Sequence, residues 1–134
     1  MINYFSFIIS CIIVGIILFQ SFFIAPSINK IIDSKEAAKL LRYIWPKFFI
    51  SISVLSFFSL LINYYIGQEN TVNSFIIVSI ILMFICYFIT PLINRAKDNS
   101  KNKLWTVLHV LSIILTLITL ILNILVIFNW KLNA

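Results

Sequence analysis

Charged residues are scarce in this chain, and acidic ones are the scarcest. In 134 residues there are 4 Asp and Glu against 10 Lys and Arg, giving a net charge of +6. Charged residues make up 10% of the sequence, and hydrophobic residues make up 62%. A water-soluble domain of this length needs far more polar surface to cover its core. The composition therefore excludes a soluble fold and predicts a protein embedded in a lipid bilayer.

The residue types that most catalytic and cofactor sites require are also few. The chain has one histidine, two cysteines and two glycines, and its apolar runs contain no acidic residue. The sequence contains no phosphate-binding glycine loop, no GxSxG, CxxC or CxxCH motif, and no cluster with metal-ligand spacing. Cys11 and Cys86 lie inside apolar runs, where we interpret both as buried thiols. We therefore expect no enzymatic activity and no bound cofactor or metal.

Long apolar runs are what the sequence has in abundance. Crossing a hydrocarbon core of about 30 Å takes around 20 helical residues. Four runs reach that length, at about residues 2–25, 47–66, 72–93 and 104–128. The sequence thus predicts an all-α membrane protein, a four-helix transmembrane bundle forming a single domain over residues 1–134.

The connections between these runs carry their own signals. The stretch Glu36–Leu41 favours helix, and we interpret it as a short amphipathic turn along the membrane surface. Pro46 suits the first turn of the second span, where its missing N–H costs nothing. Gly67–Asn70 has the composition of a tight turn.

The distribution of basic residues predicts an orientation. Every Lys and Arg except Lys131 lies in or beside the first or third connection, and the second connection has none. By the positive-inside rule both basic connections face the cytoplasm and both termini lie outside, as in a bacterial inner-membrane protein. Because the bases sit in short membrane loops, a nucleic-acid partner is excluded. Aromatic residues fall at both expected interfaces: Trp45 and Trp105 inside, and Tyr4, Tyr64, Tyr65 and Trp130 outside.

One stretch occurs twice. Residues 23–33 return 65 positions later as residues 88–98, each copy with a Pro, an Asn, a base and an Asp in the same order. These positions are Pro26, Asn29, Lys30 and Asp33, and Pro91, Asn94, Arg95 and Asp98. A second set of matches has an offset of 60: Trp45 with Trp105, Ser56 with Thr116, Ser59 with Thr119, and Asn63 with Asn123. We predict two parallel helical-hairpin repeats, 1–66 and 72–128, related by an axis along the membrane normal.

The two prolines of this repeat allow two interpretations. Proline removes a backbone donor and disfavours helix before it, so Pro26 and Pro91 predict helix termination. Alternatively, they form paired kinks that frame a cytoplasmic vestibule ringed by Lys30 and Arg95. In either case we expect Asp33 and Asp98 to be local counter-charges, and the neighbouring asparagines to bond freed carbonyls.

Polar residues recur at helical spacing in two spans. Intervals of three and four residues place them on one helix face. They are His109, Ser112, Thr116, Thr119 and Asn123 in the fourth span, and Ser56, Ser59 and Asn63 in the second. Polar side chains in hydrocarbon turn inward, so we predict that this polar seam faces the bundle interior. It either allows close packing of the helices or provides a path for a small solute or a lipid headgroup.

His109 and Gln20 are further polar residues within spans. A lone intramembrane histidine can relay protons or ligate a metal or haem. A haem held from both sides would need a second chain, because this one has a single histidine. We favour a packing histidine that bonds Ser112 or a loop group. Gln20 is expected to pair with another helix.

Four segments together resemble a known family. They are Gly15-x-x-x-Phe19-x-x-Phe22-Phe23-Ile24-Ala25-Pro26, then Trp45-Pro46-Lys47-Phe48-Phe49, then residues 91–98, and finally His109-x-x-Ser112. In this order they resemble the domain of unknown function 4149 family, which includes transmembrane protein 205-like proteins. The resemblance implies a four-span bundle and no particular biochemical activity.

Three functions follow from these patterns. The leading hypothesis is a non-enzymatic accessory or interaction protein, whose partners are the bilayer and a membrane protein or a second copy. The second is permeation of a small solute or ion along the polar seam. The third is a haem or metal membrane subunit that uses His109.

Overall fold

The computed structural model describes residues 1–130, and four helical spans account for most of them. The first span is built from η1 (Ile2–Tyr4), α1 (Phe5–Phe19), η2 (Gln20–Ile24) and α2 (Ala25–Ile31); the others are α3 (Ser34–Ile66), α4 (Asn70–Asp98) and α5 (Asn102–Asn129). Each span is long and apolar enough to cross a membrane. The predicted four-helix bundle is confirmed. Lys131 lies outside the described residues.

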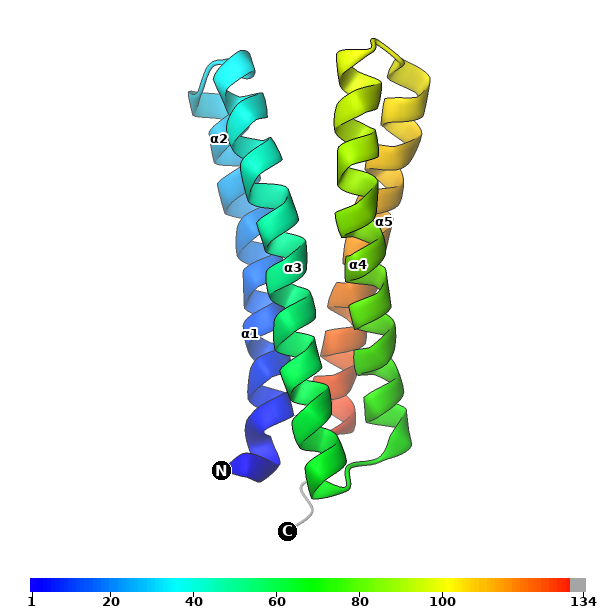
Figure 1. The fold of residues 1–134 in the computed structure, drawn as a ribbon. Coiled ribbons are helices and arrows are strands. Elements are labelled where there is room, and N and C mark those ends of the chain that lie inside the picture. The colour runs from blue at the N-terminus through cyan, green and yellow to red at the C-terminus, as the bar shows by residue number, and fades with distance from the viewer. Residues whose placement is uncertain (131–134) are drawn as a thin grey trace.

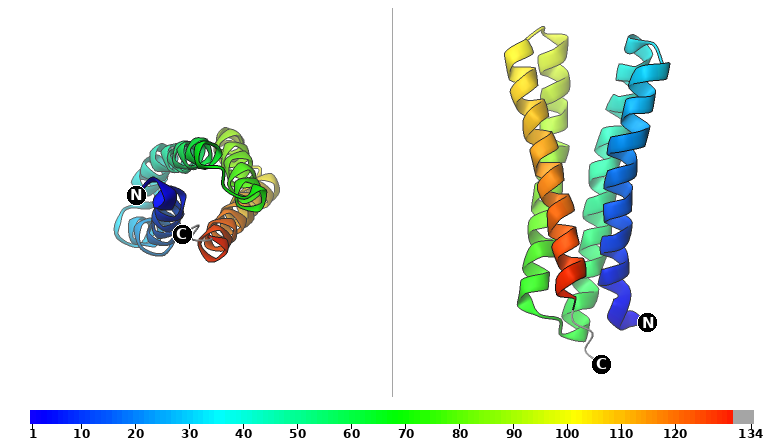
Figure 2. Two further views of the ribbon diagram at one scale, coloured as in Figure 1. Left: turned by 90° about the horizontal axis from the view of Figure 1, so that it is seen from below. Right: turned by 180° about the vertical axis from the view of Figure 1, so that it is seen from behind.

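The spans form two antiparallel pairs (Figure 1). We call α1, η2, α2 and α3 the first pair, and α4 with α5 the second pair. Around the bundle the order is α1, α3, α4, α5, and α5 also contacts α1 (Figure 2). The end with residues 32–33 and 99–101 is called the basic end, and the opposite end, with residue 1 and the Gly67 turn, the terminal end. The two pairs lie close at the terminal end and diverge toward the basic end (Figure 1).

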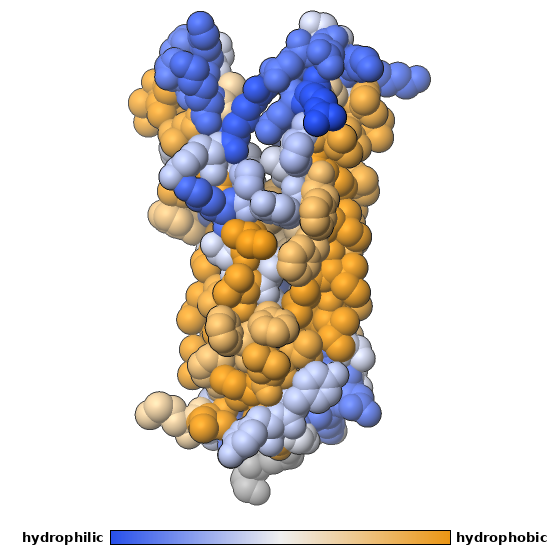
Figure 3. All heavy atoms as spheres, in the orientation of Figure 1, coloured by the Kyte–Doolittle hydropathy of each residue, from blue (hydrophilic) through white to orange (hydrophobic). Residues whose placement is uncertain are grey.

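The outer surface is the part of the molecule that requires a bilayer. On the face seen in Figure 3, apolar residues form a band over the middle of the bundle, and hydrophilic residues cover the basic end. Large side chains such as Phe22, Phe58 and Phe88 are more than half exposed on this band. Cys11 is also exposed here, which corrects its predicted burial, whereas Cys86 is buried as expected. In water such a surface would be unstable, whereas in lipid it is matched by the acyl chains.

The second span is longer than predicted. α3 runs without a break from Ser34 to Ile66, and Pro46 lies inside it. The predicted surface turn at residues 36–41 and the placement of Pro46 in a first turn are therefore wrong. Residues 34–45 carry strong helix formers, and Ala37 is 2% exposed beside α2, so this segment packs along the bundle instead of lying on the membrane. Proline within a membrane helix is tolerated where neighbouring helices pack around it.

The predicted termination at Pro26 and Pro91 is also wrong. The first span continues to Ile31 and the third to Asp98. The two copies differ in local structure, because the π-helical segment η2 directly precedes Pro26, whereas α4 passes through Pro91 without interruption. A π-turn widens the helix, which makes room for a proline ring that clashes with the preceding turn. The backbone hydrogen-bond pattern of the first span therefore changes just before its proline, whereas that of the third span does not.

The core of the bundle is a group of apolar side chains at mid-height, which we call the apolar cluster. It consists of Ile9, Ile13, Ile17, Phe48, Phe49, Ile52, Met83 and Cys86. Residues from both pairs meet here, so the cluster joins them where the ribbons begin to diverge. Trp45 stacks on Phe49 with ring centroids 5.8 Å apart, which closes the cluster toward the basic end. A smaller group, Val72, Ile76 and Val126, packs with Trp130 near the terminal end.

The turn between the pairs agrees with its composition. Gly67 ends α3 with φ +70°, the left-handed conformation that glycine adopts without a Cβ clash. Its N–H and that of Gln68 both donate to the carbonyl of Asn63. This turn directs α4 back along α3.

Candidate functional site

The candidate site is the polar interior between the apolar cluster and the terminal end. Six of the eight predicted seam residues are buried, each with 8% exposure or less: Ser56, Ser59, Asn63, Thr116, Thr119 and Asn123. His109 and Ser112 are only half-buried. The structure therefore places most of the polar seam inside the bundle.

In the second pair the seam residues are bonded within the pair. Thr116 Oγ1 donates to the carbonyl of Ser112 at 2.8 Å, and Thr119 Oγ1 donates to the carbonyl of Leu115 at 3.0 Å. Asn123 Nδ2 donates to the Thr119 carbonyl at 2.9 Å and to Ser79 Oγ of α4 at 3.4 Å. The amide of Asn123 thus both bonds its own helix and links α5 to α4.

In the first pair the matching residues are bonded differently. Ser6 Oγ donates to the carbonyl of Ser59 at 3.1 Å and also contacts Asn63 Oδ1, which links α1 to α3. Asn63 Nδ2, Ser56 Oγ and Ser59 Oγ are fully buried and make no hydrogen bond to a described residue. We call Ser56, Ser59 and Asn63 the α3 polar row. Unpartnered polar atoms are costly in a membrane interior, where bulk water is absent.

The interior holds buried polar residues that the sequence reasoning missed. Ser6 and Ser10 of α1 are at most 1% exposed, and α3 and α4 add Ser53, Asn73, Ser79 and Thr90. The spacing of four between Ser6 and Ser10 is a helical signal that marks an inward face.

The apolar cluster interrupts the seam before the basic end. One turn beyond Ser56, Ile52 is 0% exposed, and Ile13 and Met83 from neighbouring helices are at most 1% exposed. Polar residues continue past this level: Ser112 and His109 of α5 are half-buried, and Thr90 of α4 is buried and donates its hydroxyl to the Cys86 carbonyl. The polar interior is therefore closed on this side by packed side chains.

His109 lies beyond the cluster, near the basic end. Its ring stacks on Trp105, with centroids 5.0 Å apart and planes 8° apart. Lys97 Nζ lies 4.4 Å from the centroid of the Trp105 ring. The predicted hydrogen bond with Ser112 is absent among residues 1–130, since stacking orients the ring instead. No group of three His, Cys, Asp or Glu suited to a metal is found in this part of the chain.

The basic end has one ion pair between the helix pairs. Arg42 of α3 holds Asp98 of α4 with two contacts, at 2.6 and 3.2 Å. Asp98 was expected to balance a neighbouring base, but its partner comes from the other pair. The α3 segment around Arg42, which the sequence reasoning placed on the membrane surface, brings this guanidinium to α4.

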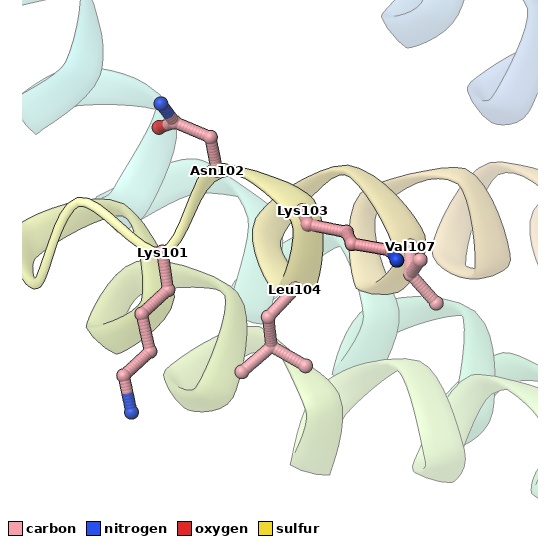
Figure 4. A pocket seen from close by; sticks show the side chains of 5 residues that line it. All are labelled: Lys101, Asn102, Lys103, Leu104 and Val107. Carbon is pink, nitrogen blue, oxygen red and sulfur yellow. The ribbon is translucent and has the colours of Figure 1, made fainter.

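The repeated motif is not assembled into one site. Pro26, Asn29, Lys30, Asp33, Pro91, Arg95 and Asp98 are exposed, and Asn94 is half-buried. The side chains of Asn29 and Asn94 make no hydrogen bond, as donor or as acceptor, to any described residue. A shallow hollow beside the start of α5 is lined by Lys101, Asn102, Lys103, Leu104 and Val107 (Figure 4). All five residues are exposed, so this hollow is an open surface feature.

The fold defines the class of the protein as a multi-pass helical membrane protein. Residues 8–102 match the family described as "Domain of unknown function (DUF4149)". The match covers most of the chain, so the chain belongs to this family, as the sequence motifs indicated. No curated protein and no solved structure matches the chain.

Proposed function

We propose that this protein is a non-enzymatic accessory or interaction protein of a cell membrane. The observation that carries the proposal is the packed interior: the apolar cluster closes the polar seam, and the buried seam residues of α5, Thr116, Thr119 and Asn123, bond their own helix and, through Asn123, α4. Such a bundle is suited to holding a fixed outer shape rather than to passing a solute. The basic connections would face the cytoplasm under the positive-inside rule.

The partner in this proposal is another membrane protein or a second copy of the chain. Native mass spectrometry after gentle extraction tests it. The proposal predicts a stoichiometric additional protein mass, or a fixed number of copies. A bare monomer that carries only lipid would contradict it.

Permeation along the seam is the second candidate, and the unpartnered atoms of the α3 polar row favour it. It is tested by solute flux in proteoliposomes with Thr119→Leu, which places a larger apolar side chain in the interior. The matched control is Ile118→Leu, next to it in sequence but on the outer surface. Flux that is lost in Thr119→Leu and kept in Ile118→Leu would establish permeation. Absence of protein-dependent flux in the parent chain is the result that the accessory proposal predicts.

A further inference from the structure

We propose that the α3 polar row holds a short file of water molecules, which enters from the terminal end and stops at the apolar cluster. This goes beyond the accessory function and does not depend on it. The starting observation is that Ser56 Oγ, Ser59 Oγ and Asn63 Nδ2 are all buried on one helix and all lack a partner among the described residues.

The chemistry of the row fits water. Asn63 Nδ2 can only donate, whereas the two hydroxyls can donate and accept. A guest must therefore offer both an acceptor and a donor within a small volume, as water does. Buried water in proteins typically bonds polar groups that are otherwise unsatisfied.

The spacing of the row also fits water. At 1.5 Å of rise per residue, Ser56 and Ser59 are about 4.5 Å apart along the helix, and Ser59 and Asn63 about 6 Å. One water with two hydrogen bonds of about 2.8 Å can bridge Ser56 and Ser59. One or two waters can bridge the longer interval between Ser59 and Asn63.

The two ends of the file are set by the structure. Asn63 is one turn from Gly67, where α3 ends at the terminal end. Ser53, one turn beyond Ser56, donates its hydroxyl to the Phe49 carbonyl at 3.0 Å and so offers no unpartnered atom, and Ile52 beside it is 0% exposed within the apolar cluster. Apolar cavities stay dry, so the file ends there. Water thus contacts the first pair along this row, while the matching residues of the second pair are hydrogen-bonded to other protein groups.

The second pair supplies an internal control for the test. Asn63 and Asn123 are matched in sequence and both buried, but of the two Nδ2 groups only that of Asn123 has acceptors within residues 1–130. In the ¹⁵N-labelled full-length protein in lipid nanodiscs, magnetisation transfer from water to the two side-chain amides is compared. The proposal predicts strong transfer to Asn63 and little to Asn123. Equal transfer to both, or none to Asn63, would overturn it.

Cysteine accessibility is an independent readout. In a Cys11→Ala, Cys86→Ala background, Ser59→Cys and Ile52→Cys are treated in membranes with a small, membrane-impermeant thiosulfonate. Thiolate is the reactive form and needs water to be stable, so we expect Ser59→Cys to react about tenfold faster or more. Equal rates at the two positions would contradict a file that is confined to the row. A retained circular dichroism spectrum verifies that each variant is folded.

Discussion

Asn123 of the second pair donates its amide to the Thr119 carbonyl and to Ser79, while Asn63 of the first pair leaves the same group without a partner among residues 1–130. The second pair has two uninterrupted helices. The first has a π-helical segment with a proline after it, and Gln20, which begins that segment, has an amide nitrogen without a partner in the described part of the chain. Similar residues at matching positions thus give seam residues on α5 that are bonded within the protein and an α3 polar row that depends on other groups. The second pair keeps one unpartnered atom of its own among residues 1–130, Asn73 Oδ1 of α4. The difference arises from which residues lie opposite each asparagine.

The largest effect is expected where the two pairs meet. Ile52→Ala removes a fully buried side chain from the apolar cluster and leaves a cavity, which should lower the unfolding free energy by about 2–5 kcal/mol. Equilibrium unfolding in mild detergent measures it, with the outer-surface variant Val78→Ala as control. Similar stability of the two variants would show that the cluster does not join the pairs.

The next effect contrasts the two asparagines. Asn123→Ala breaks two hydrogen bonds and should cost about 1–3 kcal/mol, because buried acceptors lose their donor. Asn63→Ala should cost less, because it also removes an unpartnered donor. The same unfolding measurement compares them. A larger loss of unfolding free energy in Asn63→Ala than in Asn123→Ala would contradict the account, because it would mean that Asn63 is the more strongly bonded of the two.

Two glycine substitutions, one in the turn after α3 and one inside α1, are expected to have opposite effects on stability. Gly67→Ala places a Cβ at φ +70° and should destabilise by about 1–2 kcal/mol. Gly15→Ala lies in α1, where an added Cβ meets no atom within 4 Å, and should stabilise by about 0.5–1 kcal/mol. Thermal unfolding of both variants shows whether each substitution raises or lowers stability. Destabilisation by Gly15→Ala would mean that α1 is packed more tightly than the structure shows.

The smallest effect is expected at the basic end. Arg42 and Asp98 are paired but partly exposed, so Arg42→Ala should lower stability less than any destabilising substitution above, and less again at high salt. A double-mutant cycle with Asp98→Ala isolates the pair, and Lys35→Ala serves as a surface control. A coupling as large as the loss in Ile52→Ala would mean that the ion pair, and not the apolar cluster, holds the two pairs together.

The sequence was sufficient for the spans and for the inward face of the seam. Run length in lipid predicts a crossing helix, and intervals of three and four residues predict which residues share a face. It was insufficient where the outcome depends on a neighbouring helix. The extension of α3 back to Ser34 involves packing of the segment around Ala37 against α2, and the partner of Asp98 comes from another helix pair. The stacking of His109 on Trp105 overrides a hydrogen bond that local spacing favoured.

The candidate site shows the same limit. Burial of Ser59 and Asn63 follows from the pattern, but their hydrogen-bonding partners do not. Ser6 and Ser79 lie opposite the two asparagines because of how each pair is aligned, and that alignment is not encoded in the spacing of either helix alone. The unpartnered α3 polar row appears only when all four spans are in place.

Hydrogen–deuterium exchange of the protein in lipid nanodiscs tests the difference between the pairs most directly. Local opening is easier where hydrogen bonding is incomplete. We predict that α1, η2 and the terminal half of α3 exchange about tenfold faster than α4 and α5, a difference of about 1.4 kcal/mol in opening free energy. Equal protection of the two pairs, or faster exchange in α4 and α5, would contradict the account.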